Sequence, residues 1–61
     1  METYSILVGK VYRTPNNERR EVHAMDKGDV IYLDVAAPAA PKRMPLAQFA
    51  AEVESEVAPS P

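Results

Sequence analysis

The chain has 61 residues, of which 46% are hydrophobic and 26% are charged, and its formal net charge at pH 7 is −2. This length allows one small domain, and the composition is typical of a globular chain and not of a disordered one. Because there are no cysteines, neither disulfides nor thiolate-rich zinc sites can stabilise the core.

We expect residues 1–57 to form a single domain and residues 58–61 to form a disordered tail. The sequence has no apolar run long enough to cross a bilayer, and no basic segment precedes its first apolar residues. We therefore expect a cytoplasmic protein with neither a signal peptide nor a membrane partner. The oligomeric state stays open, because a chain of this size without disulfides often depends on association for its stability.

The first predicted strand covers Ser5 to Thr14, where β-branched and aromatic residues dominate, and Gly9 marks a bulge or a sharp bend within it. Pro15 to Glu18 has the proline and the asparagines of a turn, which predicts a hairpin. The second strand follows in the sequence RREVHAM, whose period of two places Val22 and Ala24 on the inner face.

The third predicted strand covers Val30 to Val35, after a tight turn that has Gly28 at its third position. Both faces of this strand are apolar, which is typical of a central strand covered on both sides. We expect the C-terminal helix to cover the second of these faces. The first face carries Val30 and Tyr32, and the second carries Ile31, Leu33 and Val35.

The segment Ala36 to Pro41 is predicted to be a stiff connector, because proline lacks an N–H and restricts the residue before it. A short fourth strand can run through Pro41 to Met44. Pro45 then begins a helix, beyond which apolar residues repeat with helical spacing. The apolar face of this helix consists of Leu46, Phe49, Ala50, Val53 and Val57.

Together these elements predict an α+β fold that is mostly β, with a small bent antiparallel sheet of three to four strands and one C-terminal helix packed on it. The predicted core consists of the inward apolar residues of the strands and the helix. These are Ile6, Val8, Val11, Val22, Ala24, Val30, Tyr32, Leu33, Leu46, Phe49 and Val53.

The order of these features resembles small SH3-like β-barrel proteins that are common in bacterial genomes, plasmids and phages. It is similar to short bacterial domains of unknown function in which a V-x-Y strand is followed by a basic residue, PL, two residues and Phe. The tryptophan usual in that pattern is absent, and AAPAAP replaces a glycine-bearing turn. The resemblance implies a partly closed SH3-like barrel and carries no catalytic residue. It covers roughly Val8 to Val53, and its positions here are Val30, Tyr32, Arg43, Pro45, Leu46 and Phe49.

Patterns that carry catalysis or bind metals are weak in this sequence. His23 could bind a metal together with Glu21 and Asp26, but a divalent site needs three or four converging ligands with further support, and a half-exposed strand histidine is the simpler interpretation. The serines lie outside any nucleophile motif, and the two glycines are too far apart for a phosphate loop. We therefore predict no enzyme activity, no metal and no cofactor.

Two segments carry candidate binding residues. Pro38 to Arg43 matches the P-x-x-P-x-R pattern that binds aromatic grooves, although a stiff loop explains the same residues. On the hairpin, an exposed Tyr12 could stack on a nucleobase while arginines contact phosphates; the alternative places Tyr12 in the core and the arginines in solvent. The candidate partner-binding residues are Tyr12, Arg13, Arg19, Arg20, Lys42 and Arg43.

Charge is distributed unevenly along the chain. Lys10 to Arg20 contains four cations and one anion, whereas the last ten residues carry three glutamates and no cation. Such asymmetry can orient binding to a charged partner. Our leading hypothesis is a non-enzymatic interaction protein, encoded by a phage or mobile element, that binds and modulates or inhibits a larger host protein. The alternative is a nucleic-acid-associated or transcription-regulating module that uses the basic hairpin Lys10 to Arg20.

Overall fold

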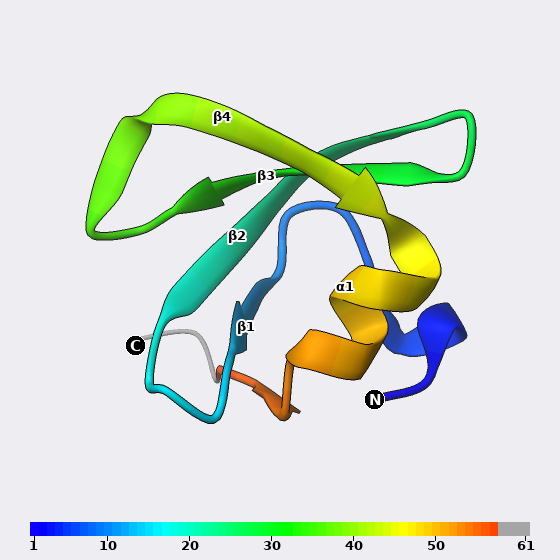
Figure 1. The fold of residues 1–61 in the computed structure, drawn as a ribbon, viewed down its shortest axis with the longest axis horizontal. Helices are drawn as coiled ribbons and strands as arrows, with labels where there is room; N and C mark the ends of the chain where they lie inside the picture. Colours follow the sequence, from blue (N-terminus) through cyan, green and yellow to red (C-terminus); the bar gives the residue numbers. More distant parts are fainter. Residues whose placement is uncertain (58–61) are drawn as a thin grey trace.

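The computed structural model describes residues 1–57, and the tail predicted for residues 58–61 lies outside this part. The described chain forms one antiparallel sheet and one α-helix, which confirms the coarse α+β class (Figure 1). The sheet has five strands in the order β4-β3-β2-β1-β5, more than the three or four expected. The elements are η1, a 3-10 turn (Thr3–Ser5), β1 (Val11–Arg13), β2 (Arg19–Asp26), β3 (Asp29–Asp34), β4 (Ala37–Pro45), α1 (Leu46–Glu52) and β5 (Ser55–Glu56).

The first predicted strand, residues 5–14, is wrong in its first half. The chain forms η1 beside α1 and then a turn at residues 8–9, so β1 begins only at Val11. Gly9 has a φ of +88°, a left-handed conformation that glycine adopts without steric cost. Its N–H donates a 2.8 Å hydrogen bond to the Val22 carbonyl. The bend expected at Gly9 is therefore present, and it directs the preceding residues toward the helix.

Both predicted turns between the first three strands are confirmed. Asn17 has a φ of +66°, and the N–H of Thr14 donates to the carbonyl of Glu18 at 2.9 Å, which closes the first hairpin. Lys27 and Gly28 have φ values of +52° and +82°, so both central residues of the second turn are left-handed, as a type I′ hairpin turn requires.

The period of two in β2 is interrupted by a β-bulge at His23. Val22 lies opposite Tyr32, whereas Ala24 lies opposite Ile31, its neighbour in β3. Because consecutive strand residues point to opposite faces, the extra residue turns Ala24 to the outer face. The predicted inner position of Ala24 is therefore wrong, while that of Val22 is confirmed.

The predicted connector before the helix is instead most of β4, which forms one edge of the sheet. Proline is tolerated in an edge strand when its nitrogen points away from the neighbouring strand. The N–H of Leu46 donates to the Gly28 carbonyl at 3.0 Å, and hydrogen-bonding positions alternate along an antiparallel pair. In this register the nitrogens of Pro41 and Pro45 point away from β3.

The helix begins at Leu46, one residue after its predicted start at Pro45, and it ends at Glu52. Val53 is extended, and the next residues form β5, which pairs with β1. The N–H of Glu54 donates to the Arg13 carbonyl at 2.7 Å, and the N–H of Val57 donates to the Val11 carbonyl at 2.8 Å. The predicted helical position of Val57 is therefore wrong, because residues after the helix supply hydrogen bonds along the free edge of β1.

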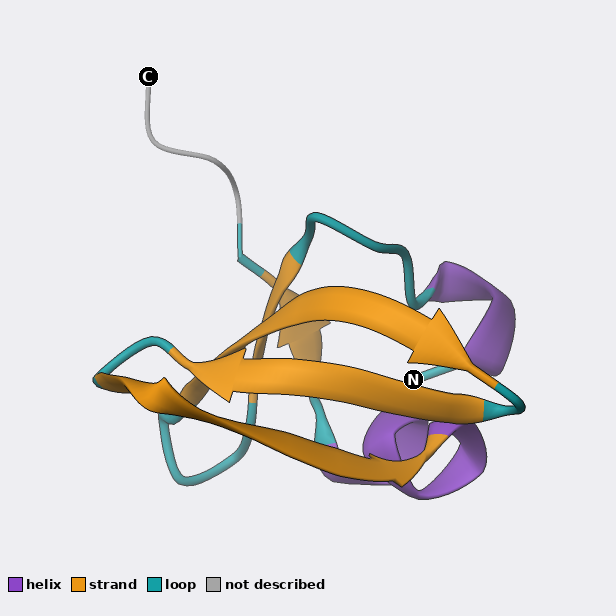
Figure 2. Cartoon of the chain, turned by 90° about the horizontal axis from the view of Figure 1, so that it is seen from above, coloured by secondary structure: helices purple, strands orange, loops and turns teal. Residues whose placement is uncertain are grey.

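The core lies between the helix and one face of the sheet. Phe49 is at its centre, where its ring meets Tyr12 edge-on at 6.0 Å and Tyr32 at 5.3 Å between ring centroids. Of the predicted core, Val8 is 57% exposed, and Val11, Ala24, Leu33 and Leu46 are only half-buried. Figure 2 shows both helical segments at the same end of the sheet. The buried apolar residues are Ile6, Tyr12, Val22, Val30, Tyr32, Phe49, Ala50 and Val53.

Candidate functional site

One face of the sheet has no element packed on it within residues 1–57. The helix contacts β3, β4 and η1, and it covers the face that carries Val30 and Tyr32. The expectation that it covers Ile31, Leu33 and Val35 is therefore wrong. We call the uncovered side the open face. From the strand register it carries Val11, Arg13, Arg19, Glu21, Ala24, Asp26, Asp29, Ile31, Leu33, Val35 and Arg43.

An apolar stripe follows β3 along the open face. Ile31 and Leu33 are half-buried by their neighbours, and Val35, just beyond the strand, is 48% exposed. The backbone N–H of Val35 donates to the Arg19 carbonyl at 2.9 Å, which places the two residues opposite each other. The stripe therefore ends beside a cation.

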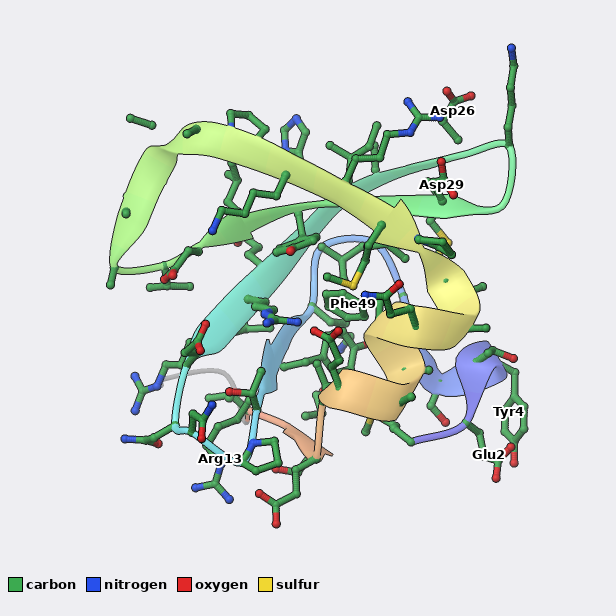
Figure 3. The ribbon with its side chains drawn as sticks, viewed as in Figure 1. Glu2, Tyr4, Arg13, Asp26, Asp29 and Phe49 are labelled. Atoms are coloured by element: carbon green, nitrogen blue, oxygen red, sulfur yellow. The ribbon has the colours of Figure 1, made fainter. Side chains whose placement is uncertain are left out.

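Arg13 and Arg19 lie directly opposite each other on β1 and β2, and we call them the arginine pair. The neighbouring Thr14 and Glu18 are hydrogen-bonded, so the arginines occupy the non-hydrogen-bonded position, where facing side chains are closest. Like charges at such positions destabilise a sheet. In Figure 3, Arg13 projects away from the body of the molecule. The fold therefore brings together two cations that repel each other.

Only one member of the arginine pair has an ionic partner within residues 1–57. The Arg13 Nη2 lies 3.9 Å from the Glu54 Oε2, and the two side chains are 46% and 57% exposed. Arg19 is exposed and forms no ion pair in the described part of the chain. An exposed pair of this kind contributes little to stability, because solvent screens both charges.

Two shallow hollows flank Arg19. One has a volume of about 230 Å³ and is lined by Arg13, Arg19, Ser55, Glu56 and Val57. The other has a volume of about 360 Å³ and lies between the first hairpin turn and the turn after β3. It is lined by Asn17, Glu18, Arg19, Asp34, Val35 and Ala36. The second hollow thus combines the Arg19 cation with the carboxylates of Glu18 and Asp34 and with the aliphatic side chains of Val35 and Ala36.

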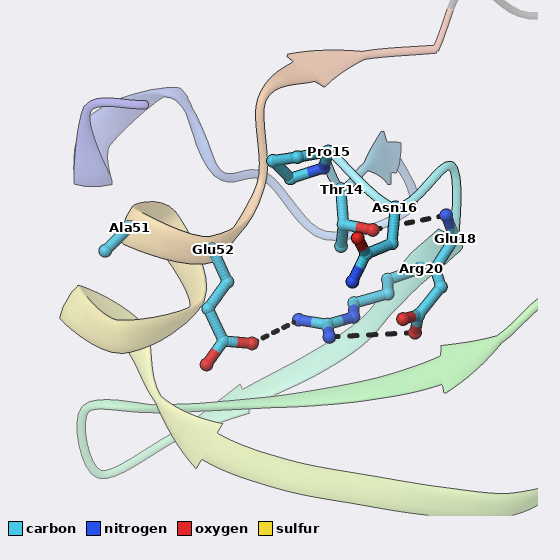
Figure 4. Close-up of a pocket in the computed structure, with 7 residues that line it drawn as sticks. All are labelled: Thr14, Pro15, Asn16, Glu18, Arg20, Ala51 and Glu52. Atoms are coloured by element: carbon cyan, nitrogen blue, oxygen red, sulfur yellow. Dashed lines mark hydrogen bonds and ion pairs between the residues drawn. The ribbon is translucent and has the colours of Figure 1, made fainter.

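Arg20, in contrast to Arg19, is held by contacts within the fold. Its Nη1 donates to the Glu52 Oε1 at 2.8 Å, its Nη2 lies 3.8 Å from the Glu18 Oε2, and its guanidinium lies 5.2 Å from the Tyr32 ring centroid. Figure 4 shows Glu18, Arg20 and Glu52 among the residues that line a hollow of about 300 Å³ between hairpin and helix. The hydrogen bond from Arg20, and then that from Gln48, lowers the pKa of Glu52. Arg20 therefore ties the helix to the hairpin.

The uneven charge of the sequence is largely paired in the fold. Two hairpin cations meet glutamates because β5 runs antiparallel along β1, and Arg20 meets Glu52 because the helix packs beside the hairpin. The joined residues are Lys10 with Glu56 at 3.8 Å, Arg13 with Glu54 at 3.9 Å and Arg20 with Glu52 at 2.8 Å. Within the described chain, this arrangement leaves Arg19 as the hairpin cation without an ion pair.

The remaining basic candidates are Arg43, which lies on the open face but away from the arginine pair, and Lys42. The Arg43 Nε donates to the Asp29 Oδ2 at 2.8 Å and its Nη2 to the Asp26 Oδ2 at 3.1 Å, and these bonds raise its pKa. Figure 3 places Asp26 and Asp29 far from Arg13. Arg43, the cation of the P-x-x-P-x-R pattern, is thus already bound by two carboxylates of the fold. Lys42 is exposed but lies opposite Tyr32, on the other side of the sheet from the arginine pair.

Tyr12 cannot stack on a nucleobase in this fold, because its side chain is fully buried. Its hydroxyl donates to the Ser5 carbonyl at 2.7 Å and accepts from the Leu7 N–H at 2.8 Å. These bonds hold the bend before β1 against the core. Of the two interpretations of Tyr12, the core position is the one observed.

Sequence reasoning missed an exposed apolar segment at the start of the chain. Tyr4, Leu7 and Val8 are 78%, 51% and 57% exposed. They were expected in or near a strand, where alternation buries every second side chain. Nothing in the local pattern distinguished the 3-10 turn that exposes them.

No group of three or more metal-binding side chains converges within residues 1–57, and His23 is exposed at the bulge. The part of the chain that the structure describes has no helix long and apolar enough to cross a membrane. No family model matches the chain, and no similar curated protein or solved structure was found.

Proposed function

We propose that this chain is a non-enzymatic interaction protein that binds and modulates a larger protein through its open face. The observation that carries the proposal is the apolar stripe of β3 ending beside the arginine pair with no described element over it. Apolar surface bordered by polar residues is typical of a protein interface. Like charges that face each other are unfavourable in a sheet, so a contact with a partner explains the arginine pair better than folding does.

We also propose that the sheet is a partly closed SH3-like barrel. The pairing of β5 with β1, after a chain that passes through β2, β3 and β4, supports this interpretation because it returns the last strand to the first. The resemblance to small bacterial and phage proteins supports a host protein as the partner and the cytoplasm as the place where they meet.

The alternative function, binding nucleic acid through the basic hairpin, has less support. Nonspecific binding depends on the number of cations that can neutralise phosphates. Three of the four hairpin cations already lie within 4 Å of a glutamate carboxylate. Tyr12, the aromatic side chain that could have stacked on a base, is buried.

An affinity capture with two charge-reversal variants tests the proposal. Wild type, Arg13→Glu with Arg19→Glu, and a control, Lys27→Glu with Lys42→Glu, are compared after circular dichroism has shown that all are folded. The captured protein is then purified, and its binding to each variant is measured. We expect binding to wild type and control and at least tenfold weaker binding to the arginine variant.

Two results would contradict the proposal. One is equal binding of the purified partner to both charge-reversal variants, because the open face would then be irrelevant. The other is binding of a single-stranded oligonucleotide that falls steeply with salt and is lost in the arginine variant. The second result would favour the nucleic-acid function.

A further inference from the structure

The chemistry around the arginine pair identifies the kind of segment that fits the open face. We infer that the partner docks an acidic peptide segment there, with carboxylates on Arg13 and Arg19 and an aliphatic side chain beside Val35, and that Glu54 competes with this segment for Arg13. This inference rests on the proposed function of the open face and specifies its partner.

Charge complementarity favours an anion at this place. Two arginines held opposite each other repel, and an anion that bridges them removes the repulsion while accepting charge-assisted hydrogen bonds. Arg19 has no ionic partner within residues 1–57, and Arg13 has only a distant one. An incoming anion therefore gains contacts that the described fold does not already make.

The surroundings favour a peptide over a nucleic acid. Bases bind single-strand-binding proteins by stacking on aromatic side chains, and no residue of the open face is aromatic. The hollow beside Arg19 is lined in part by Val35 and Ala36, which suit an aliphatic side chain. The anion that already approaches Arg13 is a carboxylate, that of Glu54.

The edges of the sheet favour docking on the face. An added strand needs outward N–H groups, and the nitrogens of Pro41 and Pro45 occupy two of the outward positions of β4. At the other edge, β5 has only two residues in the described chain. The segment is therefore expected to lie across β1, β2 and β3.

Glu54 is placed as an internal competitor. Its carboxylate lies 3.9 Å from Arg13, and both side chains are about half exposed. A carboxylate of the partner that binds Arg13 more tightly can therefore displace that of Glu54. Removing this carboxylate should free Arg13 without touching the core. The matched control is Glu2→Gln, which makes the same change in net charge and, in Figure 3, lies far from Arg13.

The test uses a blocked peptide, acetyl-Asp-Leu-Glu-Asp-Leu-Glu-amide, titrated into ¹⁵N-labelled protein and followed by amide shifts. We expect shifts at Arg13, Arg19, Val35 and Ala36. Arg19→Gln should weaken binding about tenfold or more, because it removes a charged hydrogen-bond donor. Glu54→Gln should strengthen binding by up to about fivefold, the scale of one exposed ion pair, while Glu2→Gln changes it less.

Four results of the titrations would overturn the inference. They are no binding of the peptide to wild type, shifts that map away from Arg19, equal effects of Glu54→Gln and Glu2→Gln, and tighter binding of a ten-residue thymidine oligonucleotide under the same conditions. A dimer in sedimentation that Arg19→Gln dissociates would also overturn it, because the occupant would then be a second copy. The capture experiment tests the proposed function separately. If a captured partner needs the arginine pair but binds Glu54→Gln no more tightly than wild type, the proposed function stands and only this inference is refuted.

Discussion

Replacing Phe49 by alanine tests the packing on which the whole structure depends. Phe49 has no exposed surface and contacts both buried tyrosines, Tyr12 and Tyr32, through its ring. Truncating a buried phenylalanine costs about 3 to 5 kcal/mol, which includes the loss of aromatic contacts. A 61-residue domain has a total stability of roughly 3 to 9 kcal/mol. We therefore expect Phe49→Ala to remove about half or more of the stability and to lower the urea midpoint strongly.

The measurement is a urea titration followed by far-ultraviolet circular dichroism, with the dispersion of amide proton shifts as a second readout. Gln48→Ala, on the exposed side of the same helix, is the control, and its midpoint should stay near that of wild type. Phe49→Leu keeps most of the buried apolar volume and should lie between the two. A Phe49→Ala variant with the same midpoint as Gln48→Ala would refute the position of Phe49 in the core.

Three further outcomes are expected. Tyr12→Phe should lower the free energy of unfolding by about 1 to 3 kcal/mol in a urea titration, because two backbone groups lose their partner; an unchanged midpoint would argue against these bonds. Pro41→Ala with Pro45→Ala should increase self-association, measured by sedimentation at rising concentration, since outward N–H groups appear at the edge of β4; a strictly monomeric variant would contradict this. The lowered pKa of Glu52 means that its bond with Arg20 stabilises the fold above the ordinary pKa of glutamate, about 4.3, and that this stabilisation is lost as the pH falls through the lower folded value. The urea midpoints of wild type and Glu52→Gln should therefore differ at pH 6 and converge in acid, whereas a difference independent of pH would exclude this linkage.

Local chemistry was enough to predict the turns and the start of the helix. Gly28 and Asn17 mark left-handed turn positions, and Pro45 marks the helix start, because these preferences act within a few residues. The end of the helix was not predictable in this way. Val53 and Val57 keep the helical spacing, but the free edge of β1 recruits the residues after Glu52 into a strand.

The same limit applies to the candidate site. The proximity of Arg13 and Arg19 could have been predicted, since the turn over residues 15–18 folds their strands together. The ion pair between Arg20 and Glu52 depends on where the helix packs. Whether one face of the sheet stays uncovered depends on the face against which the helix packs. Contacts between residues distant in sequence decide both, and no local pattern encodes them.

The ion pairs between hairpin and C-terminal glutamates also have a consequence for synthesis. The ribosome makes Lys10, Arg13 and Arg20 well before it makes their partners Glu56, Glu54 and Glu52. During that interval the hairpin lacks these three carboxylates, and the edge of β1 has no strand beside it. These ion pairs therefore stabilise the finished fold and not the isolated hairpin, because they form only after the segment from Glu52 to Glu56 has been made.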